Sequence, residues 1–232
     1  MNRLRNLVLL AAALGAPVAQ GAQNRPPAIS SAETVKFKLL WPSGVTLGEA
    51  VLSVTPAKGE VRFEMTMEAA TPIRNFSAAF SSVATADGLC SLQFHRKTTE
   101  GAKSSEESIE FDQNAHLAKR TLNGQTTAIP MPECARDVLT FLYYFRNQLA
   151  AGHPAATASV YLGPDRSLEI QHAGAEKVTV AGREQSADKY SVTYRRPGSA
   201  RSFDVWFSSG ARREPLLVRL PTPLATFSAE LE

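Results

Sequence analysis

Apolar and polar residues alternate along most of this chain. Over residues 61–69 every odd position is apolar and every even position is polar. The same period of two recurs at 35–41, 109–111, 178–180, 190–194, 203–207 and 227–231. Successive side chains of a strand point to opposite faces, so this pattern is typical of a sheet with one buried face. It predicts roughly ten to thirteen strands.

Turn residues separate these runs and leave only short connections. Asn123–Gly124 favours a two-residue hairpin turn, because both residues tolerate a positive φ. Short connections between amphipathic strands indicate an antiparallel meander. The predicted fold is therefore mainly β, a curved antiparallel sheet or incomplete β-barrel.

Residues 137–146 depart from the period of two and predict one α-helix. Pro132 precedes this segment and Gly152 follows it, as expected of the two ends of a helix. At about 100° per residue the apolar positions fall on one wide arc. These positions are Val138, Leu139, Phe141, Leu142, Phe145 and Leu149. We expect the curved sheet to enclose this helix.

Arg146 lies at the edge of the apolar arc and has two interpretations. It is either a snorkelling side chain or half of a structural ion pair, or a guanidinium that binds the carboxylate or phosphate of a ligand at the mouth of an apolar cavity. In the second case Tyr143 and Tyr144 are further candidates for polar contacts, and Leu142 for the apolar lining.

The N-terminus predicts export. Arg3 and Arg5 precede an apolar run at 7–14, and small residues follow at 19–22, which is typical of a secretory signal peptide. The run is too short to span a membrane. We expect a signal peptide at 1–21, cleaved near Gly21 or Ala22, a flexible lead-in at 22–33, and one β-rich periplasmic domain at 34–232 with no transmembrane span.

The charge of the chain gives no sign of nucleic-acid binding. The net charge is +3 and the pI about 8.9, but loss of Arg3 and Arg5 with the signal peptide would leave about +1. No basic cluster remains in the sequence after that.

The chain has two cysteines, Cys90 and Cys134. In an exported protein such a pair predicts a disulfide, and this one would tie the segment before the helix to a strand. Two buried free thiols are the alternative.

A search for catalytic motifs finds no nucleophile elbow, zinc-protease motif, P-loop or dinucleotide fingerprint. The four histidines lack metal-ligand spacing. Glu106 and Glu107, beside two serines, are expected in a solvated loop. We therefore predict no catalytic residue, metal or cofactor. Trp206 lies opposite the apolar face of its strand, where it either contacts a ligand or partner or packs under a loop.

The chain resembles a bacterial family known as domain of unknown function 3108. Its helix is similar to the family stretch Asp-x-Leu-Ser/Thr-x-x-Tyr-Tyr-x-Arg, and Trp41 and the segment around 205–215 resemble two of its hairpins. The stretch is carried here by Asp137, Leu139, Thr140, Tyr143, Tyr144 and Arg146. The resemblance implies an exported, mostly β protein without an assigned activity, similar in architecture to the open β-barrels of periplasmic lipoprotein carriers.

Three functions follow as hypotheses. The first is a non-enzymatic module that binds an apolar or lipid-like molecule between sheet and helix. The second is a structural or interaction protein of the cell envelope, with a fully packed core and a protein partner. The third is a hydrolase without a recognisable motif.

Overall fold

The structure is a computed structural model that describes residues 29–70, 75–153, 157, 159–222 and 225–232. The expected signal peptide and most of the expected lead-in lie outside the described residues. The last lead-in residues take part in the fold, because Ile29 packs against a core cluster and Glu33 is the first residue of a strand.

The described chain forms thirteen strands and one helix. The strands are β1 (Glu33–Leu40), β2 (Thr46–Ala57), β3 (Glu60–Ala70), β4 (Asn75–Thr85), β5 (Ser91–Glu100), β6 (Lys103–Asp112), β7 (Leu117–Leu122), β8 (Gln125–Pro130), β9 (Ser167–Val180), β10 (Arg183–Arg196), β11 (Ser199–Ser208), β12 (Pro215–Pro221) and β13 (Thr226–Leu231). The helix is α1 (Val138–Ala150).

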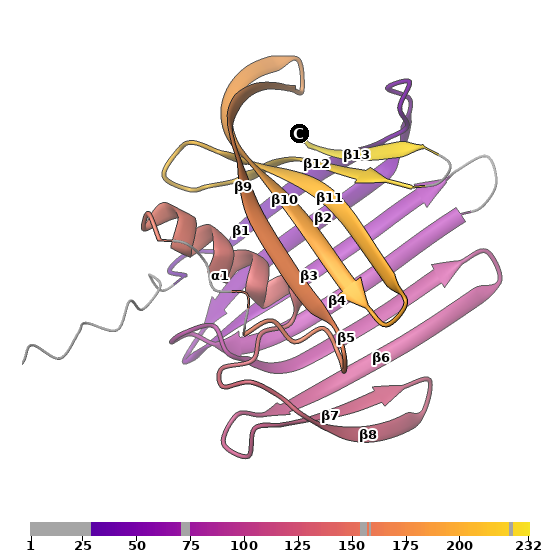
Figure 1. Cartoon of the computed structure of the whole chain (residues 1–232), viewed down its shortest axis with the longest axis vertical. Helices are drawn as coiled ribbons and strands as arrows, with labels where there is room; N and C mark the ends of the chain where they lie inside the picture. The colour runs from indigo at the N-terminus through magenta and orange to yellow at the C-terminus, as the bar shows by residue number, and fades with distance from the viewer. Residues whose placement is uncertain (1–28, 71–74, 154–156, 158, 223–224) are drawn as a thin grey trace, which may run out of the picture.

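All thirteen strands belong to one antiparallel sheet. Its order is β8-β7-β6-β5-β4-β3-β2-β1-β13-β12-β11-β10-β9. Strands that follow one another in sequence are therefore paired, apart from β8 and β9, and β1 pairs in addition with β13. Figure 1 shows β9, β10 and β11 crossing in front of the strands of the first half, so that the sheet curls over itself. Strands β8 and β9 are the two edges and do not pair with each other. The predicted fold, an incomplete barrel with one helix, is confirmed.

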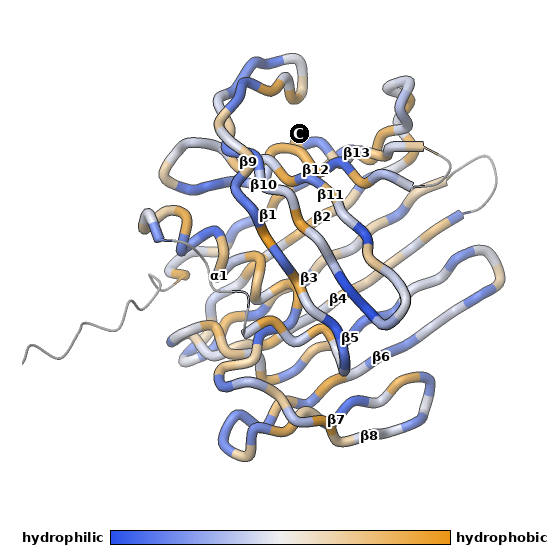
Figure 2. Tube along the Cα trace, in the orientation of Figure 1, coloured by the Kyte–Doolittle hydropathy of each residue, from blue (hydrophilic) through white to orange (hydrophobic). Residues whose placement is uncertain are grey.

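The period of two decides which side chains the sheet buries. Val61 and Phe63 of β3 are fully buried, whereas Arg62 and Glu64, which alternate with them, are exposed. Figure 2 shows the same alternation of hydrophobic and hydrophilic residues along other strands. The predicted Asn123–Gly124 hairpin is also confirmed, since it joins β7 to β8 with both residues at positive φ.

Helix α1 lies in the connection between the two edge strands of the sheet, since it follows β8 and precedes β9. Leu139 and Tyr143 pack in a core cluster with residues of β2, β3 and β4. Phe141, Phe145 and Leu149 pack in another with residues of β10 and β11. The helix therefore lies across the concave face of the sheet. With 13 residues it is too short to span a membrane, and the described part of the chain contains no helix that is long and apolar enough to do so.

One local prediction is wrong. Glu106 and Glu107 are not in a loop but within β6, where Glu107 points to the buried side with Ile109. The polar run around these residues suggested a solvated loop. Glu107 is nevertheless buried, because its charge is paired with those of Arg96 and Arg120.

Candidate functional site

A cavity lies between helix α1 and the concave face of the sheet. Its volume of about 350 Å³ is within the range of small-ligand sites, roughly 300–1,000 Å³. The helix contributes Val138, Phe141, Leu142 and Phe145 to its wall, and strands β1–β3 and β9–β13 contribute most of the remainder. Tyr190 alone among the described lining residues carries a polar side-chain group. Such a wall suits a hydrocarbon and offers little to a polar ligand.

The cavity exists because large rings hold the helix off the sheet on both flanks. On one flank Tyr143 packs against Phe63, with ring centroids 5.0 Å apart. On the other, Phe145 packs against Tyr190 and Phe207 at 5.3 and 5.5 Å. Leu142 lies between the flanks, borders both clusters, and is too short to fill the space.

The cavity reaches the surface at the first turn of the helix. Val138, the first residue of α1, lines the cavity and is also 42% exposed. Leu168 and Ile170 of the edge strand β9 line it too and are partly exposed. A ligand therefore has a route into the cavity beside the open seam of the barrel.

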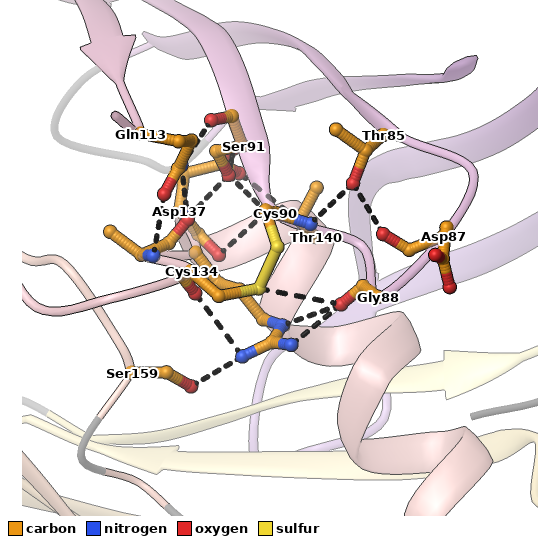
Figure 3. Close-up of a disulfide and its surroundings, with 12 residues drawn as sticks. Thr85, Asp87, Gly88, Cys90, Ser91, Gln113, Cys134, Asp137, Thr140 and Ser159 are labelled. Carbon is orange, nitrogen blue, oxygen red and sulfur yellow. Dashed lines mark hydrogen bonds between the residues drawn. A yellow bond between two sulfur atoms is a disulfide. The ribbon is translucent and has the colours of Figure 1, made fainter. Parts of the chain in front are cut away.

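The segment before the helix is tied to the sheet by the predicted disulfide. Cys90 and Cys134 are bonded, which confirms the pairing and excludes the alternative of two free thiols (Figure 3). The bond joins the connection between β4 and β5 to the residues that lead into α1.

Arg136 adds further links at the same place. Its guanidinium donates to the Gly88 carbonyl at 2.6 Å and to the Ser159 hydroxyl at 2.7 Å. It also lies over the ring of Tyr144, 3.9 Å from the ring centroid. Tyr144, a candidate for ligand contact from sequence, is therefore engaged by Arg136 and does not line the cavity.

Asp137 caps the helix from a fully buried position. Its carboxylate accepts hydrogen bonds from the hydroxyls of Ser82 and Ser91, at 2.5 and 2.6 Å, and from the backbone N–H groups of Leu139 and Thr140. Burial raises the pKa of Asp137, while these donors act in the opposite direction. The first part of the family stretch, Asp-x-Leu-Thr, thus fixes where the helix begins.

Arg146 forms a structural ion pair. Its guanidinium holds both carboxylate oxygens of Glu33, at 2.7 and 3.0 Å, and the Tyr143 hydroxyl donates to the same carboxylate. The hydrogen bond from Arg146 is the main cause of a lowered pKa at Glu33. Neither Arg146 nor Tyr143 lines the cavity. Of the two interpretations from sequence, the structure therefore supports the ion pair, because the guanidinium is directed at β1.

Trp206 does not face the helix. It is 2% exposed, packs with Val178, Leu216 and Leu217, and donates from Nε1 to Glu176 at 2.5 Å. Its packing supports the alternative of a buried tryptophan, since neighbouring strands cover it on the side of the sheet away from the cavity.

Of the five residues proposed as ligand contacts, only Leu142 lines the cavity. The structure adds residues that sequence reasoning had treated as ordinary core. Three of them, Val192, Val205 and Phe207, are inward positions of β10 and β11 whose signal was the period of two. The described lining contains no carboxylate, imidazole, thiol or aliphatic hydroxyl, and no metal-binding cluster of His, Cys, Asp or Glu occurs in the described residues.

The family described as protein of unknown function, DUF3108, matches residues 34–232. The chain belongs to this family. No curated protein matches the sequence.

Two solved structures are similar. The β-barrel-like protein of domain of unknown function DUF1849 from Brucella abortus has a TM-score of 0.58 at 8% identity, over 89% of this chain and 98% of that one. This similarity shows a shared fold. The Mycobacterium tuberculosis lipoprotein LppX is 13% identical over 86% of this chain and 84% of that one, with a TM-score of 0.27, which is too low to support an argument.

Proposed function

We propose that this DUF3108 protein is a non-enzymatic binding module of the periplasm that holds an apolar or lipid-like ligand between helix and sheet. The observation that carries the proposal is the apolar cavity of about 350 Å³ under α1. A cavity at the lower end of the small-ligand range suits one hydrocarbon chain rather than a lipid with several chains.

The chemistry of the wall sets the expected affinity. Burial of one CH₂ group contributes about 0.8 kcal/mol. Affinity for a series of linear alcohols should therefore rise about fourfold per added CH₂ until the chain fills the cavity, and then level off.

The proposed compartment rests on two supports. A disulfide such as Cys90–Cys134 is typical of oxidising compartments, and the signal peptide proposed at 1–21 would direct the chain there.

The second hypothesis, an envelope protein that acts through a protein partner, assumed a fully packed core, and the cavity weighs against it. The hydrolase hypothesis receives no support from the lining.

The test compares two tryptophan substitutions. Val138→Trp places a large ring at the mouth of the cavity, whereas the control Leu117→Trp changes a residue of similar exposure on β7, away from the cavity. We expect Val138→Trp to weaken dodecanol binding at least about tenfold and the control to leave it unchanged, as measured by displacement of a fluorescent fatty-acid analogue. Native mass spectrometry of protein purified from cells should show a bound lipid. Absence of binding by the wild-type protein to every alcohol in the series would contradict the proposal.

A further inference from the structure

A second group of polar residues lies on the concave face, outside the cavity. Glu107 of β6 accepts a hydrogen bond from Nε of Arg120 at 2.5 Å and forms an ion pair with a terminal nitrogen of Arg96 at 2.7 Å. The side chain of Glu107 is 7% exposed and that of Arg120 is 14% exposed. Ile109 and Phe111, which follow Glu107 at intervals of two, are core residues, so the three charged side chains belong to the buried side of the sheet.

The charges of this group do not balance. One carboxylate faces two guanidinium groups, and the described residues show no second acid in contact with either arginine. Each guanidinium has five N–H donors, and Glu107 occupies one nitrogen of each. The group therefore retains one positive charge and several donors.

Tyr161 brings a buried hydroxyl to the same place. Its side chain packs edge-on against Phe111, with ring centroids 5.5 Å apart, and the residue is 6% exposed. The hydroxyl has no hydrogen-bond partner among the described residues, which is uncommon for a buried polar group. Tyr161 belongs to the same core cluster as Ile109 and Ala118, which are two residues along the strand from Glu107 and Arg120 respectively. Burial raises the pKa of Tyr161, and the nearby charges of Arg120, Glu107 and Arg166 also influence it.

The group lies close to the cavity. Met65, which lines the cavity, is the cross-strand neighbour of Phe80, and Phe80 is that of Arg96. Neighbouring strands are about 4.8 Å apart, so the backbone of Arg96 is about 10 Å from that of Met65. Leu162, adjacent to Tyr161 in the chain, also lines the cavity.

We propose that Arg96, Arg120 and the Tyr161 hydroxyl bind the anionic head group of a single-chain amphiphile whose tail occupies the cavity. The inference rests on the proposed function and narrows its ligand class to amphiphiles with a carboxylate or phosphate head. Glu107 orients both guanidinium groups, and the remaining N–H donors and the hydroxyl bind the head-group oxygens, an arrangement that guanidinium favours for planar or tetrahedral anions. Arg166 adds positive charge nearby.

The test compares ligands that share a tail. Dodecanoate, dodecyl phosphate and uncharged dodecanol, each below its micelle concentration, are titrated into the full protein by calorimetry. We expect at least one anionic ligand to bind about tenfold more tightly than dodecanol. Which of the two anions binds better identifies the head group as carboxylate or phosphate, and acetate and inorganic phosphate alone should compete only weakly, because they have no tail.

Two variants locate the head-group site without loss of the fold. Arg96→Gln changes an arginine whose side chain is 35% exposed and leaves the Glu107–Arg120 pair intact, and Tyr161→Phe removes only a hydroxyl. Each should reduce the preference for the anion over dodecanol about threefold or more, and the affinity for the anion should fall more than that for dodecanol. Arg201→Gln, at an exposed position of β11, is the charge-matched control and should change neither.

The outcomes separate the two proposals. If dodecanol binds well and neither anion is preferred, the inference fails and the proposed function stands. If the anion is preferred equally by wild type, Arg96→Gln and Tyr161→Phe, the head group is bound elsewhere and the inference also fails. If no ligand with a dodecyl tail binds, both proposals fail.

Discussion

Helix α1 meets the sheet differently on one of its flanks and along the strip between its flanks. The flank with Leu139 and Tyr143 packs closely against β2, β3 and β4 and is held by the disulfide, the Asp137 cap and the Arg146–Glu33 pair. The side with Val138 and Leu142 borders a cavity. The residues that stand out in the sequence are thus the ones that hold the helix, and the ones that form the cavity are unremarkable apolar residues.

The difference explains how the cavity persists. An apolar space collapses when the elements around it can move inward, since lost contacts destabilise its walls. Here the N-terminal end of the helix is covalently tied to the sheet and Arg146 is paired with β1. The fixed flank prevents the helix from sinking into the space under Leu142.

The largest effect is expected from removal of the covalent link on the fixed flank. The double substitution Cys90→Ser with Cys134→Ser opens a loop defined by a sequence separation of 44. The free energy of unfolding should fall by about 4 kcal/mol in urea unfolding, because the unfolded chain regains conformational entropy. Reduced wild-type protein is the control and should show a similar loss. A change below about 1 kcal/mol would show that the link contributes little.

The same truncation on the packed flank and in the strip over the cavity should have unequal costs. Leu139→Ala removes contacts in a packed cluster and should lower the free energy of unfolding by about 3 kcal/mol. Leu142→Ala removes a side chain that already borders a cavity, so about 1 kcal/mol is expected. Both are measured by chemical denaturation of protein freed of lipid. Equal costs would indicate that the space under Leu142 is filled in solution.

The smallest effect concerns the ion pair and pH. Arg146 lowers the pKa of Glu33 below its ordinary value of 4.5. The stabilisation of the fold by the Glu33–Arg146 pair is therefore fully present above pH 4.5. It is lost as the pH falls through the lower pKa of the folded state, where Glu33 becomes protonated. Glu33→Gln should therefore be less stable than wild type by about 1 kcal/mol at pH 7. The difference in unfolding free energy should shrink below pH 4.5, and a difference independent of pH would contradict this role.

Much of the fold was predictable because its signals are local. The period of two at residues 61–69, the Asn123–Gly124 turn and the apolar arc of the helix each depend on neighbours in sequence. The pairing of Cys90 with Cys134 was predictable because the chain has two cysteines. The packing around the helix was harder to predict from sequence, because the direction of the Arg146 side chain depends on Glu33, which lies 113 residues away. The cavity itself has no sequence signal, because it depends on the distance that Tyr143 and Phe145 impose between helix and sheet.

The pairing of β1 with β13 has a consequence for the time course of folding. Phe37 and Leu231 are cross-strand neighbours. A ribosome that adds about 5–20 residues per second nevertheless needs roughly ten to forty seconds to synthesise the chain between them. During this interval one edge of β1 has no partner strand, and unpaired edges promote association between chains. Completion of the sheet must await the last strand, so premature termination of synthesis should release a chain prone to aggregate rather than a smaller stable barrel.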